Sequence, residues 1–100
     1  MSEPMPVEEF VQVLLDEMPE SVRSQVEVEM VKGTNVAWLY FKNGMKAHLM
    51  SSQGGVRVLA TWEQGIAEVK LTAKGLKSVD EVLAFLVLAG KAHKCLGGGP

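Results

Sequence analysis

Cysteine is almost absent from this chain: Cys95 is the only one among 100 residues. A lone cysteine forms no disulfide within the chain, so the fold must be held together by its apolar core. The composition, 47% hydrophobic and 22% charged, is typical of a folded globular domain and not of a disordered segment. Low cysteine usage also favours a reducing compartment, and we expect a cytoplasmic protein.

Long hydrophobic runs are missing as well. The longest, VLAFLVLAG, covers only residues 82–90, whereas a membrane-spanning helix needs about 20 apolar residues. The N-terminal segment MSEPMPVEEF lacks the basic stretch and apolar run of a secretory signal. We therefore expect a soluble protein without a membrane partner.

Motifs that carry chemistry are the third absence. The sequence holds neither a phosphate-binding loop nor a dinucleotide-binding glycine pattern. His93 and Cys95 are neighbouring potential metal ligands, but a zinc site usually needs about three or four. We therefore predict no catalytic residue, no metal site and no cofactor, and we expect that the protein is not an enzyme. An enzyme or small-ligand carrier with its site between sheet and helices is kept as an alternative.

Two segments have the apolar spacing of amphipathic helices. In the first, Pro6 suits the opening position and Pro19 ends the helix; its apolar stripe is Val7, Phe10, Val11, Leu14, Leu15 and Met18. The second begins at Ser78, which stands at capping-box spacing from Glu81. Its core stripe is Val79, Val82, Leu83, Leu86 and Gly90, and a second apolar stripe is Phe85, Leu88, Ala89, Ala92 and Leu96. We expect one domain over residues 1–96 and a flexible tail at 97–100.

Residues 20–31 fit two interpretations. Val22, Val26 and Met30 have helical spacing. The segment VEVEMV instead alternates apolar and acidic residues and is rich in β-branched side chains, which favours a strand. We expect five strands in the whole domain, or four if this segment is helical.

Turn sequences recur in the middle of the chain and predict a meander of antiparallel hairpins; they are Gly33-Thr34-Asn35, Asn43-Gly44, Gln53-Gly54 and Gln64-Gly65. We take the first as a three-residue loop and the others as two-residue loops. The resulting register pairs Met30 with Trp38, Trp38 with Leu49, Leu49 with Val58, and Trp62 with Ala67. It generates a single apolar face that runs across all the strands and includes Trp38, Tyr40 and Trp62.

The predicted fold is therefore an α+β domain, a five-stranded antiparallel meander with an N-terminal and a C-terminal helix. Two helices, each about 10 Å across, can cover a sheet roughly 20 to 24 Å wide, so we expect both on the Trp38 face. The opposite face then stays open and carries Leu39, Phe41, Lys46, His48, Met50 and Leu59. The alternative arrangement places one helix on each face.

An apolar centre with a charged rim is typical of an interaction surface. We therefore predict a small non-catalytic interaction module or regulator, which forms a homodimer through this face, with Phe41 as its anchor, or binds another protein. Single-stranded nucleic acid is the alternative ligand, because open antiparallel sheets with aromatic and basic residues can bind it. It is the weaker prediction, because phosphate would be repelled by the acidic residues of this face, Glu27, Glu29, Glu63 and Glu68.

Overall fold

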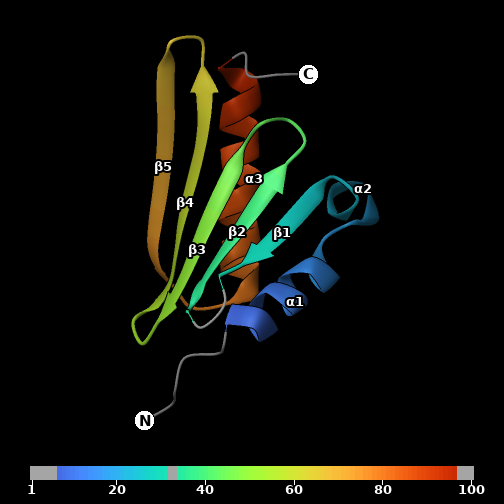
Figure 1. Ribbon diagram of the computed structural model, residues 1–100, viewed down its shortest axis with the longest axis vertical. Helices are drawn as coiled ribbons and strands as arrows, with labels where there is room; N and C mark the ends of the chain where they lie inside the picture. The colour runs from blue at the N-terminus through green and yellow to red at the C-terminus, as the bar shows by residue number, and fades with distance from the viewer. Residues whose placement is uncertain (1–6, 32–33, 97–100) are drawn as a thin grey trace.

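A computed structural model of the chain describes residues 7–31 and 34–96. The predicted role of Pro6, the turn at Gly33 and the expected tail at 97–100 lie outside these ranges. The elements in chain order are α1 (Val7–Glu17), α2 (Glu20–Arg23), β1 (Val26–Met30), β2 (Val36–Phe41), β3 (Lys46–Ser52), β4 (Gly55–Gln64), β5 (Ala67–Leu76) and α3 (Val79–Cys95). The strands form one antiparallel sheet in the order β1-β2-β3-β4-β5 (Figure 1). The predicted α+β meander is confirmed.

Both long helices pack on one face of the sheet (Figure 1). Buried side chains of α1 and α3 join those of β2, β3 and β4 in a single cluster, which includes Phe10, Val11, Leu14, Val82, Leu86, Leu39, Leu49 and Val58. At the start of α3, Ser78 Oγ accepts a hydrogen bond from the Glu81 amide at 3.2 Å, as the predicted cap requires. The domain therefore has two layers, and the arrangement with one helix on each face is excluded.

The ambiguous segment 20–31 divides between its two interpretations. Glu20–Arg23 forms a single helical turn, α2, directly after Pro19. Val26–Met30 forms the strand β1, in which Val26, Val28 and Met30 are half-buried and Glu27 and Glu29 are exposed. The alternating pattern therefore belongs to an edge strand with one covered face.

Strand β2 is turned over relative to the predicted register. Leu39 pairs with Ala47 and Ala37 with Leu49, so Leu39, and not Trp38, faces the helices. The Asn43-Gly44 turn is one residue longer than predicted: the Gly44 amide bonds to the Phe41 carbonyl at 3.0 Å, and the Phe41 amide bonds to the Met45 carbonyl at 2.9 Å. Gly44 adopts a φ of 97°, the left-handed conformation that closes such a three-residue loop. An odd change in loop length exchanges the two faces of the strand that precedes it. The β1–β2 pairing is shifted by one residue as a result, because Met30 pairs with Ala37 and not with Trp38.

The other three strands, β3, β4 and β5, keep their predicted faces. Leu49 pairs with Val58, as expected. In the last hairpin Trp62 pairs with Val69 and not with Ala67, a slip of two residues that leaves each side chain on its predicted face. Trp62 is accordingly buried, with 3% of its surface exposed. Near the far end of this hairpin a β-bulge interrupts the pairing, where Gly75 has a φ of 71°.

Candidate interaction face

The face of the sheet turned away from the helices is the candidate site, and we call it the open face. The strand registers arrange its side chains in rows that cross the sheet. The central row is Glu29, Trp38, His48, Leu59 and Thr72. On one side of it lies the row Glu27, Tyr40, Lys46, Thr61 and Lys70, and on the other the row Val36, Met50 and Arg57. These rows define which residues can contact a common partner.

Four of the six predicted site residues lie on the open face: Lys46, His48, Met50 and Leu59. The prediction is wrong for the other two. Leu39 has 0% of its surface exposed and belongs to the core, and Phe41 is half-buried and packs against the core clusters. Both errors follow from the inverted strand β2, and Phe41 cannot be the anchor of a contact on this face.

Trp38 and Tyr40 are the site residues that sequence reasoning missed. Their rings stack with centroids 6.2 Å apart and planes at 14°. The His48 ring lies 4.4 Å from Trp38 on the neighbouring strand. The Tyr40 hydroxyl donates a hydrogen bond to Glu29 Oε1 at 3.0 Å. The signal that could have found them is Gly44, since glycine at that position suits a three-residue loop as well as a two-residue one.

Two side chains of the open face have shifted pKa values. The hydrogen bond to Glu29, followed by burial and by the Glu29 charge, raises the pKa of Tyr40 above 10.0. Burial first, and the nearby Arg57 charge second, lower the pKa of His48 below 6.5. His48 is therefore mainly neutral near pH 7, and its ring can pack against Trp38 without a charge.

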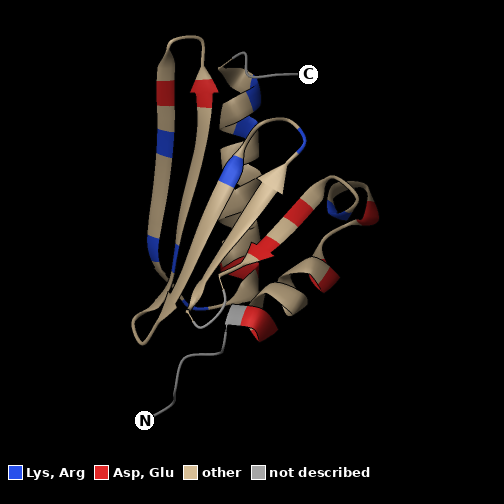
Figure 2. Cartoon of the chain, in the orientation of Figure 1, with Lys and Arg blue, Asp and Glu red and all other residues tan. Residues whose placement is uncertain are grey.

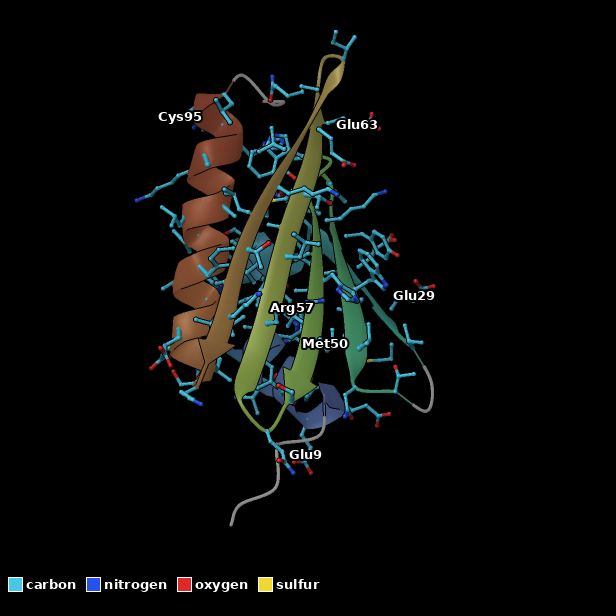
Figure 3. The ribbon with its side chains drawn as sticks, turned by 90° about the vertical axis from the view of Figure 1, so that its left-hand side faces the viewer. Glu9, Glu29, Met50, Arg57, Glu63 and Cys95 are labelled. Atoms are coloured by element: carbon cyan, nitrogen blue, oxygen red, sulfur yellow. The ribbon has the colours of Figure 1, made fainter. Side chains whose placement is uncertain are left out.

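Charges of one sign gather at each end of the β4–β5 hairpin (Figure 2). At the tip, Glu63 pairs directly with Glu68 across the two strands. At the bulged end, Arg57 and Lys74 line a common hollow of about 330 Å³. Figure 3 places Glu63 near one end of β4 and Arg57 near the other. Among the described residues of β4 and β5 one ion pair forms, Lys70 with Glu68 at 3.4 Å. It compensates one member of the acidic pair, while Glu63, Arg57 and Lys74 form no ion pair with any described residue.

The helical side of the molecule holds the remaining candidates. An apolar hollow of about 440 Å³ lies between α2, α3 and the β2–β3 hairpin, and none of its lining residues is charged. His93 is buried with its ring edge-on to Trp62 at 5.2 Å, while the Cys95 thiol is exposed. The described residues hold no group of three or more His, Cys, Asp or Glu side chains able to bind a metal ion. On α3, Leu88 is 61% exposed, whereas Phe85 packs inward.

No protein-family model matches the chain, and comparisons with curated proteins and with solved structures return no match. Within residues 7–31 and 34–96, no helix combines the length and the apolar character needed to cross a membrane.

Proposed function

We propose that this protein is a small, non-catalytic interaction module that self-associates through the open face. The single observation that carries the proposal is the continuous group formed by Trp38, Tyr40, His48, Met50 and Leu59, which crosses three adjacent strands. Aromatic residues and methionine are enriched at the centres of protein interfaces, and tryptophan and tyrosine are frequent energetic anchors. Charged residues surround this centre, as in the rim of an interface. We propose the cytoplasm as its compartment, because a lone cysteine suits a reducing environment.

The size of the open face sets the expected strength of the contact. A five-stranded sheet is roughly 20 Å wide, and the rows from Arg57 to Glu63 span roughly 20 Å along the strands. The face therefore presents roughly 400 Å² in projection from each copy, and more when the relief of the side chains is included. This places the contact near the lower end of specific interfaces, which bury about 1,200 to 2,000 Å² in total. We expect a reversible dimer rather than an obligate one.

The test is the molar mass in solution, measured by analytical ultracentrifugation over a range of concentrations. The parent should be a dimer, and Leu59→Glu and Met50→Glu should be folded monomers, because each places a charge at the centre of the contact. Val13→Glu is the matched control, since Val13 is 40% exposed on α1, away from this face. Circular dichroism verifies that each variant is folded. A parent that is monomeric throughout, or a control that dissociates as Leu59→Glu does, would refute the proposal.

A second candidate function is the binding of single-stranded nucleic acid to the same face. The observation that favours it is the position of Trp38 and Tyr40 on the open face, beside His48 and within reach of Lys46 and Arg57. Bases stack on such aromatic side chains, while basic groups contact the phosphates. Fluorescence anisotropy with a labelled oligothymidine tests this candidate. Binding that weakens with added salt and with Trp38→Ala would support it, and no binding at low salt would remove it.

A further inference from the structure

The two like-charged pairs of the β4–β5 hairpin carry a further inference. Like charges on directly opposed residues destabilise a sheet, so Glu63 opposite Glu68 costs the isolated domain some stability. At the bulged end Arg57 and Lys74 are not directly opposed, but they line the same hollow and bring two positive charges to one place.

Compensation of these charges is limited. At the acidic end Lys70 contacts Glu68 at 3.4 Å. At the basic end the Lys77 ammonium, which donates to the Gly54 carbonyl at 2.8 Å, adds a third positive charge. Glu81 lies near the basic end as well, and its Oε1 accepts a hydrogen bond from the Lys77 amide at 2.8 Å. The open face thus has an acidic end and a basic end.

The strand registers place these two ends symmetrically about the aromatic centre. The midpoint of the hairpin lies between the rows of Leu59 and Thr61, because Thr61 pairs with Lys70 and Leu59 with Thr72. Glu63 stands as far from this midpoint in one direction as Arg57 does in the other. Glu68 and Lys74 have the same relation on β5. A two-fold rotation about an axis that crosses the strands at this midpoint therefore exchanges the acidic and the basic ends.

We propose that the partner of the open face is a second copy bound in this antiparallel arrangement, with the acidic end of each hairpin over the basic end of the other. This inference rests on the proposed self-association and specifies its geometry. Two sheets packed face to face lie about 10 Å apart, with their strands aligned to within about 30°. Side chains from both inner faces fill that space, so Glu63 faces Arg57 of the second copy and Glu68 faces Lys74 of the second copy. Symmetry doubles each contact.

The same rotation brings the aromatic centres together. On β2 it places Trp38 of one copy over Tyr40 of the other, since these residues lie on opposite sides of the midpoint row. It also places Glu27 over Glu29 of the second copy, an unfavourable contact at the outer edge of the sheet, where solvent screens it. An axis parallel to β3 would pair Glu27 with Lys70, but it would set Lys46 against its own copy and place Arg57 over the uncharged Val36 of the second copy. The antiparallel arrangement therefore matches more of the charges.

Charge-reversed variants test the arrangement without altering the aromatic centre. The basic variant carries Glu63→Lys and Glu68→Lys, and the acidic variant carries Arg57→Glu and Lys74→Glu. The dissociation constant of each variant dimer should be at least roughly tenfold higher than that of the parent, because every end-to-end contact becomes repulsive. A mixture of the two should form a heterodimer, since each acidic end again meets a basic end. Ultracentrifugation of the separate and mixed variants measures this directly.

A third variant controls for non-specific attraction between oppositely charged proteins. Lys91→Glu with Lys94→Glu changes the net charge as much as the acidic variant does, but on exposed positions of α3. This control should dimerise like the parent. When it is mixed with the basic variant, it should form no more heterodimer than the parent forms when mixed with the basic variant. The inference would be overturned if the basic variant formed as much heterodimer with this control as with the acidic variant.

The outcomes separate this inference from the proposal on which it rests. If the parent is monomeric, both fail. If the parent dimerises and Leu59→Glu dissociates it, while both charge-reversed variants still dimerise, the open face is the interface and the antiparallel arrangement is wrong. If each variant is monomeric alone and their mixture is dimeric, the arrangement is established.

Discussion

Leu39→Ala and Leu59→Ala delete the same atoms from opposite faces of the sheet, and the difference between them tests the orientation of β2. Leu39 has 0% of its surface exposed, whereas Leu59 is half-buried on the open face. The two-residue turn predicted from the sequence would place both leucines on the open face and give similar, small losses. The three-residue loop places only Leu59 on the open face, so the two losses of stability should differ.

The size of the difference follows from the surroundings of Leu39. Its row across the core face contains two alanines, Ala47 and Ala60, which are too small to move into the space that the deletion leaves. A buried Leu→Ala substitution costs about 2 to 5 kcal/mol, and more when the cavity cannot collapse, so we expect about 3 to 4 kcal/mol at Leu39. Leu59→Ala removes side-chain surface that is already partly in water and should cost about 1 kcal/mol.

Urea unfolding followed by far-ultraviolet circular dichroism measures both losses. A domain of this size has a free energy of unfolding of about 5 to 15 kcal/mol, so both variants should remain folded in water. The experiment is run at a protein concentration where the parent is monomeric, so that any dissociation of a dimer does not enter the result. Equal losses at the two positions, with unchanged urea dependence, would contradict the orientation of β2 described above.

Three further predictions concern single side chains. Cys95→Ser should change the free energy of unfolding by less than about 0.5 kcal/mol, because the thiol is exposed; a larger loss in urea unfolding would reveal a packing role. Tyr40 is the only tyrosine, so an absorbance titration should give a midpoint above 10.0 that Glu29→Gln lowers, and an unchanged midpoint would argue against the hydrogen bond. The unfolded chain binds a proton at His48 more readily than the folded chain does, because the folded-state pKa is lowered below 6.5. The free energy of unfolding should therefore fall as the pH drops through 6.5, and it should fall less in His48→Gln. Identical pH profiles for the parent and the variant would contradict the burial of the ring.

The accuracy of the sequence-based register depended on whether each loop was misjudged by an even or an odd number of residues. In the β4–β5 hairpin the pairing slipped by two, and Trp62 still entered the core as predicted. At Asn43-Gly44 the loop differed by one, and Leu39 and Trp38 exchanged faces. Composition could not resolve this case, because both faces of β2 carry large apolar side chains.

The part of the site that was predicted lies on β3 and β4, where polar and apolar residues alternate clearly. Lys46 and His48 alternate with Ala47 and Leu49, so only one orientation of β3 buries an apolar face. Strand β2 offers no such contrast, since Trp38 and Leu39 are both suited to a core. The orientation of β2 was decided by the backbone conformation of Gly44. A glycine in the sequence allows a positive φ but does not require one, so the sequence alone could not fix the loop length.

The two outer strands of the sheet limit how copies of this chain can meet. An edge strand presents unpaired backbone groups that invite another strand, and proteins protect such edges with short strands, charges and bulges. Here β1 has only five residues, with Glu27 and Glu29 exposed, and β5 carries exposed Lys70 and Lys74 beside the bulge at Gly75. Both edges therefore disfavour the strand-by-strand addition that would extend the sheet from molecule to molecule into a fibre. Growth of that kind has no natural end, whereas contact between two open faces covers both of them and stops at a pair.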